Sequence, residues 1–191
     1  MDALIKAYHT GKLNGVEEIS FVFSNKRDVP GLKKADAAGI KTIVIPKTKN
    51  ESVEDYEAKL YRGIASFDTK LIVLAGFMRI LSPLFLRSYR GKIINIHPSL
   101  LPAFKGIEAQ KQAYDHGVKI SGCSVHFVDE TLDGGPIILQ KAVERKDNDT
   151  AESFKNAILE QEHKLLVDAV SIVASEEYEI KDRFVLIKRR K

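Results

Sequence analysis

The sequence predicts an α/β protein with an open, mostly parallel, doubly wound sheet and an antiparallel C-terminal part. Short runs rich in Val, Ile and Phe alternate with amphipathic helical segments, and each run is followed by a turn signal. After Lys119 the pattern changes, because two extended stretches are separated only by a glycine-containing loop. With 191 residues, the chain is expected to form a single domain over residues 1–191.

The expected parallel strands are short apolar runs of the kind that is covered on both faces of a sheet. They lie at residues 19–23, 42–45, 71–75 and 93–96. The later extended stretches, joined by residues 132–135, lie at 121–129 and 136–143, and residues 183–188 are expected to form a final edge strand.

The expected helices follow recognisable start and stop signals. Ser52 stands three residues before Asp55 as a cap, Ser82-Pro83 opens a short helix, and Gly39 ends another. The helices are predicted at residues 1–5, 32–38, 52–66, 82–91 and 150–174.

Composition excludes several classes of protein. The apolar fraction of 44% and the charged fraction of 29% are ordinary, and the net charge of +4 is scattered, which suits a small anionic substrate but not nucleic acid. No apolar run approaches the roughly 20 residues of a membrane helix. Cys123 is the only cysteine, so neither a disulfide nor a metal site is predicted, and the expected location is cytoplasmic.

Polar residues at a strand end mark the candidate site. In open α/β sheets ligands bind beyond the carboxyl ends of the strands, which points to residues 76–79 and 95–98. Asn95 and His97 are two residues apart, so both side chains face the same way. An amide and an imidazole can stabilise the oxyanion of an acyl transfer, although a buried structural pair has the same signature. Asp133, before two glycines, is the best carboxylate partner; Asp129 and Glu130 remain open.

Three long motifs in order resemble the phosphoribosylglycinamide formyltransferase family: VLAGFMRILSP, INIHPSLLP and SVHFVDETLDGGPIILQ. FVFSNK and QEH extend the resemblance over nearly the whole chain. The resemblance implies the formyltransferase fold over residues 1–191. It also implies transfer of the formyl group of 10-formyltetrahydrofolate to the amine of glycinamide ribonucleotide in purine biosynthesis, without a metal.

The resemblance also implies residue roles. The catalytic set is Asn95, His97 and Asp133. The residues expected to bind the reduced folate are Met78, Arg79, Ile80, Leu81, Asn95, Val128 and Asp133. Those expected to bind the ribonucleotide are Met78, Ile96, Pro98 and Glu162. His126 is expected to support or pack, Cys123 to be a buried inert thiol, and the protein to be a monomer or weak homodimer.

The sequence departs from the family at two places. The family opens with a strand and a Gly-Ser-Asn loop that holds the substrate phosphate, whereas residues 1–5 already resemble the following helix. We expect that the sequence starts at an internal methionine; a truncation or a divergent relative are the alternatives. Val53 replaces a basic residue near the folate's acidic tail, where Lys47 or Lys49 could serve.

Other functions remain alternatives. Formyltetrahydrofolate deformylase shares the Asn-x-His and Asp pattern and resembles the chain around LPAF and AYDHGVKI. A folate-binding remnant without catalysis is the alternative from a different class. Methionyl-tRNA formyltransferase would need an additional tRNA-binding domain and a more basic chain.

Overall fold

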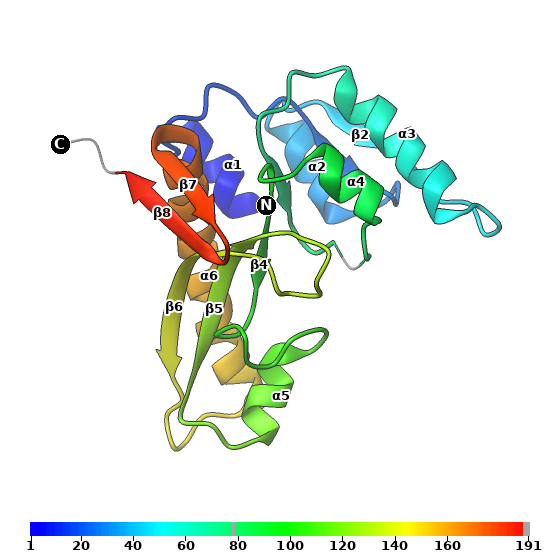
Figure 1. Ribbon diagram of the computed structural model, residues 1–191. Coiled ribbons are helices and arrows are strands. Elements are labelled where there is room, and N and C mark those ends of the chain that lie inside the picture. The colour runs from blue at the N-terminus through cyan, green and yellow to red at the C-terminus, as the bar shows by residue number, and fades with distance from the viewer. Residues whose placement is uncertain (78, 189–191) are drawn as a thin grey trace.

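The computed structural model describes residues 1–77 and 79–188 (Figure 1). Its helices are α1 (Asp2–His9), α2 (Pro30–Ala37), α3 (Val53–Ala65), α4 (Pro83–Ser88), α5 (Ala109–Asp115) and α6 (Ala151–Ser175). Its strands are β1 (Val22–Ser24), β2 (Thr42–Val44), β3 (Ile72–Leu74), β4 (Ile93–His97), β5 (Ile120–Phe127), β6 (Ile137–Glu144), β7 (Glu177–Lys181) and β8 (Phe184–Lys188).

The strands form two sheets. β1 and β2 pair in parallel, and a six-stranded sheet has the order β3-β4-β5-β6-β8-β7. Within that sheet β3 and β4 are parallel, whereas β5 is antiparallel to both β4 and β6. The predicted combination of a parallel part and an antiparallel C-terminal part is therefore confirmed.

Helices cover both faces of the strands because apolar side chains alternate between the faces. Ile72, Leu74 and Ile93 point to a cluster with α3 and α4, whereas Val73 and Ile94 point to the larger core under α6. In Figure 1, α6 runs behind β5 and β6 along their length. This doubly wound arrangement leaves the α3–α4 face of β4 available for polar side chains at its carboxyl end.

The last strand was predicted at the wrong place in the sheet. β8 lies between β6 and β7, so it is not the edge strand that the sequence suggested. The edge strand is β7, which pairs antiparallel with β8 around a turn at Asp182. In β7, charged Glu and Lys residues alternate with Tyr178 and Ile180. With only two apolar residues in the run, the strand was not recognised from the sequence. Helix α5 was also missed, since it is only seven residues long.

None of the helices in the described part of the chain combines the length and apolarity that crossing a lipid bilayer requires.

Candidate active site

A row of polar side chains lies on one face of β4, β5 and β6. Asn95 stands opposite His126, and His97 stands opposite Ser124, which in turn is paired with Gln140. Because cross-strand partners share a face, these five side chains form a polar strip on the side of the sheet away from α6. His97, Ser124 and His126 are buried. The two residues that the sequence predicted on a common face are therefore together.

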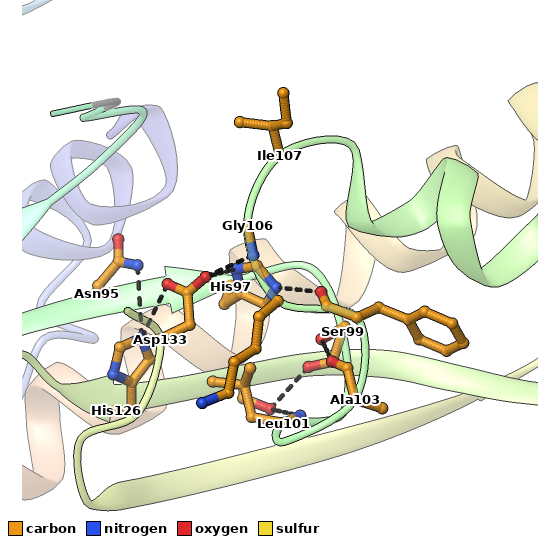
Figure 2. Close-up of polar contacts among 12 residues, drawn as sticks. Asn95, His97, Ser99, Leu101, Ala103, Gly106, Ile107, His126 and Asp133 are labelled. Carbon is orange, nitrogen blue, oxygen red and sulfur yellow. Dashed lines mark hydrogen bonds and ion pairs between the residues drawn. The ribbon is translucent and has the colours of Figure 1, made fainter. Parts of the chain in front are cut away.

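Asp133 reaches this strip from the loop between β5 and β6. Its Oδ2 lies 3.4 Å from Nδ1 of His97, and its Oδ1 lies 4.0 Å from Nε2 of His126 (Figure 2). The loop can approach because Gly135 carries no side chain: a Cβ there would lie 1.9 Å from the Phe127 carbonyl oxygen. Asp133 itself has φ of 44°, a left-handed conformation that aspartate tolerates better than most residues.

The tautomer of His126 follows from its contacts. Its Nδ1 lies 2.8 Å from the carbonyl oxygen of Phe127, which can only accept, so Nδ1 carries the proton. Burial lowers the pKa of His126, which keeps the ring neutral. Nε2 is then a hydrogen-bond acceptor, and Nδ2 of Asn95 approaches it at 3.5 Å. This contact turns the amide nitrogen of Asn95, rather than its oxygen, toward the ring.

The loop of residues 103–108 holds both His97 and Asp133 through backbone atoms. Nε2 of His97 donates to the carbonyl oxygen of Phe104 at 2.9 Å, so the free edge of the ring is Nδ1, which faces Asp133. The amide of Gly106 donates to Oδ2 of Asp133 at 2.8 Å (Figure 2). Phe104 and Gly106 both have positive φ, and this sharp backbone path turns a carbonyl and an amide toward the same two side chains.

Ser124 and Gln140 hold the segment that follows His97. The Ser124 hydroxyl donates to the Ser99 carbonyl oxygen at 2.7 Å and accepts from the Leu101 amide at 3.0 Å. The Gln140 amide donates to the Leu101 carbonyl oxygen at 3.0 Å and to the Ser124 hydroxyl at 2.9 Å. Sequence reasoning missed this network, although the period-two spacing of Ser124 and His126 in β5 was a usable signal.

The residues expected to bind the folate lie beside the strip. Arg79, Ile80 and Leu81 follow β3, whose neighbour is β4. The backbone of these three residues forms no hydrogen bond with another described residue, so its donors and acceptors are available. Val128 packs against the same apolar cluster as Leu81. Met78 was predicted to bind both substrates and lies outside the described residues.

The residues expected to bind the ribonucleotide are more dispersed. Ile96 packs against the core under α6, so its side chain points away from the polar strip, and Pro98 is half-buried beyond β4. Glu162 lies on α6, where Gln110 donates to it at 3.2 Å and burial raises the pKa of its carboxyl. The structure brings Asn95, His97 and Asp133 together, and it gives Ile96 and Glu162 other neighbours.

The sequence also led to predictions about Cys123 and about metal binding. Cys123 is fully buried, as predicted, and burial raises the pKa of its thiol to about 12. Within residues 1–77 and 79–188, no three His, Cys, Asp or Glu side chains gather closely enough to hold a metal ion.

Comparison with known proteins finds a family profile, relatives and solved structures that are similar to this chain. The formyl transferase family profile matches residues 1–170. The chain is 46% identical over 175 residues to the chicken trifunctional purine biosynthetic protein adenosine-3. The matched residues make up 92% of this chain but only 17% of that protein. It is 42% identical to Escherichia coli phosphoribosylglycinamide formyltransferase over 85% of this chain and 76% of the relative. The solved structure of glycinamide ribonucleotide transformylase 1 from Symbiobacterium toebii matches with a TM-score of 0.91 and 37% identity, over 97% of this chain and 86% of that one.

Proposed function

The chain belongs to the formyl transferase family, among the phosphoribosylglycinamide formyltransferases, and on that basis we propose its reaction. It transfers the formyl group of 10-formyltetrahydrofolate to the amine of glycinamide ribonucleotide in purine biosynthesis. The convergence of Asn95, His97 and Asp133 on one face of the sheet carries the proposal, since it supplies the donor and proton carrier that the reaction needs.

Asn95 stabilises the negative charge that develops on the formyl oxygen. The substrate amine forms a bond to the formyl carbon, and the carbonyl electron pair moves to the oxygen. One N–H of Asn95 is directed to His126, which leaves the second N–H for that oxygen. A donor that is fixed before the reaction lowers the barrier without reorganising during it.

His97 and Asp133 hold and move the proton. The amine loses a proton as the new C–N bond forms, and the folate nitrogen gains one as its bond to the formyl carbon breaks. Because Nε2 of His97 donates to Phe104, only the Nδ1 edge shared with Asp133 can carry a proton in this exchange. Asp133 accepts the proton from the amine and returns it to the leaving nitrogen, through water where the distance requires it.

The residues present fit a reduced folate. A pterin offers several donors and acceptors along one edge of a flat ring. The free backbone groups of Arg79, Ile80 and Leu81 supply the complementary set, and Val128 supplies apolar contact. This pocket binds and orients the formyl donor, while the polar strip acts on the formyl group.

Several accompanying statements stay predictions. We propose that residues 1–191 form one formyltransferase domain, since β8 beyond the matched residues 1–170 pairs with β6. Ribose binding by Glu162, a cytoplasmic location, a metal-free reaction and a monomer or weak homodimer rest on the sequence and its resemblance.

One assay tests the proposed reaction. The protein is supplied with 10-formyltetrahydrofolate, with and without glycinamide ribonucleotide, and formation of tetrahydrofolate is followed. We expect release only when the ribonucleotide is present. Release without the ribonucleotide would identify a deformylase, and folate binding without release would identify a non-catalytic protein.

A further inference from the structure

Glu57 on α3 is a buried carboxylate that the proposed reaction does not use. It is 6% exposed, and the only hydrogen bonds that its carboxylate makes within the described residues go to Ser82. Its Oε1 accepts from the Ser82 amide at 2.6 Å, and its Oε2 accepts from the Ser82 hydroxyl. A buried carboxylate is costly unless it is well hydrogen-bonded, so both contacts are needed to retain it.

Ser82 ends the irregular segment after β3 and immediately precedes helix α4. Its hydroxyl oxygen accepts from the Phe85 amide at 3.2 Å and so caps α4. The segment immediately before it contains Arg79, Ile80 and Leu81, whose backbone makes no hydrogen bond to another described residue. The hydrogen bonds from Ser82 to Glu57 therefore hold the residue that directly follows these backbone groups.

The neighbouring residue on α3 contacts the same segment. The Arg79 guanidinium lies over the Tyr56 ring, 5.4 Å from its centroid, and Leu81 packs in the cluster that contains Tyr56. Helix α3 thus contacts the segment of residues 79–82 through two adjacent side chains. Figure 1 shows α3 and α4 in the same upper part of the molecule.

We propose that Glu57 is a positioning residue for the formyl donor. By fixing Ser82, it sets the path of residues 79–81 and so presents their backbone groups to the pterin edge. The inference rests on the proposed function. It assigns Glu57 an effect on folate affinity, with no part in the chemical step.

The test compares Glu57→Gln with the unchanged protein. The amide keeps the shape of the side chain, and its oxygen and nitrogen can still contact the Ser82 amide and hydroxyl, but the charge that strengthens both hydrogen bonds is removed. We expect KM for 10-formyltetrahydrofolate to rise roughly two- to tenfold, the fold-change for replacing charge-assisted hydrogen bonds with neutral ones. The turnover number and KM for the ribonucleotide should stay within about twofold. Ser82→Thr, which keeps the hydroxyl, should leave the folate KM near that of the unchanged protein.

Asp149→Asn is the matched control. Asp149 also accepts from one backbone amide, that of Lys146, and from one serine hydroxyl, that of Ser153, but it does so at the start of α6, so its substitution should not change folate KM. Melting temperature is measured for every variant, because a purely structural role would lower stability and active fraction without separating the two KM values. The inference would be overturned if Glu57→Gln lowered the melting temperature and the active fraction without separating the two KM values, or if it left the folate KM unchanged.

Direct titration with 10-formyl-5,8-dideazafolate separates the inference from the proposed function. If the unchanged protein binds this folate analogue and Glu57→Gln binds it equally well, the inference alone fails. If the unchanged protein binds no folate, the proposed function and the inference fail together.

Discussion

The two faces of β4 and β5 are built from alternating residues of the same strands, yet they contain opposite kinds of chemistry. Facing α6 are Ile94, Val125 and Phe127, which are almost completely buried and in contact with other apolar groups. On the other face are Asn95, His97 and His126, each of which has a polar contact with a described residue. The apolar face gains stability in proportion to area removed from water, whereas the polar face gains little stability for its burial.

Under the proposed function, this difference assigns stability to the apolar face and catalysis to the polar face. Residues one position apart in a strand can be changed with different consequences, because period-two geometry sends them to different surroundings. Substitutions on the polar face should lower turnover and leave stability nearly intact. Those on the apolar face should do the reverse.

The largest effect is expected from Asp133→Asn. Asparagine tolerates the left-handed conformation at this position and can still accept from the Gly106 amide, so the loop should keep its path. The loss of the charge removes the proton carrier, and turnover should fall by roughly 10²- to 10⁴-fold. Steady-state rates and a melting curve provide the measurement. Asp129→Asn is the control; a greater loss there would assign the carboxylate role to Asp129 instead.

Phe154→Ala tests the apolar face of the sheet, against which α6 packs. Phe154 on α6 is fully buried in the main core, and its truncation should lower the free energy of unfolding by about 3–5 kcal/mol. Turnover per folded molecule should be retained. Chemical denaturation measures the free energy of unfolding, and active-site titration gives the turnover per folded molecule. Leu159→Ala, at a position that is 39% exposed on the same helix, should cost far less.

Asn95→Ala tests the polar face at the oxyanion. Removing one donor to a developing negative charge should lower turnover by about 10²- to 10³-fold, with the melting temperature close to that of the unchanged protein. The exposed Asn156→Ala serves as control. A turnover number that does not change would remove Asn95 from the mechanism.

The smallest effect is expected from Glu162→Gln. Glu162 lies on α6 and accepts a hydrogen bond from Gln110 of α5. Burial raises the folded-state pKa of this carboxyl above its ordinary value of 4.5. The ionised form is therefore disfavoured in the folded protein, and stability is lost as pH rises from about 4.5 through the folded pKa. The variant should melt at a higher temperature at neutral pH, and the difference should vanish in acid. Thermal melts across pH measure this. Glu160→Gln, whose carboxyl has a lowered pKa from Lys164, should not stabilise.

The sequence predicted the elements whose pattern is local. The runs at 42–45 and 93–96 became β2 and β4 with shifts of one residue, and the Ser52 cap of α3 is present. The pairing of β8 with β6 could not be predicted, because its register joins Ile137 to Phe184, two residues that are distant in sequence. Strand partners of this kind leave no periodic signal.

At the site, side chains were predictable and their backbone partners were not. The spacing of Asn95 and His97 and the two glycines after Asp133 made these residues candidates, and the family resemblance selected them over a buried structural pair and over Asp129 and Glu130. The carbonyl of Phe104 and the amide of Gly106 have no residue-type signature, since every residue except proline has both groups. The tautomers of His97 and His126 depend on such carbonyls, so they emerged only from the three-dimensional structure.

The loop of residues 103–108 has a bearing on protein engineering. It reaches His97 and Asp133 through main-chain atoms, and the Ile107 side chain at its tip is 75% exposed. Libraries that diversify the Ile107 side chain should therefore leave the main-chain contacts to His97 and Asp133 in place. The backbone angles at Phe104 and Gly106 are the features that such libraries must preserve.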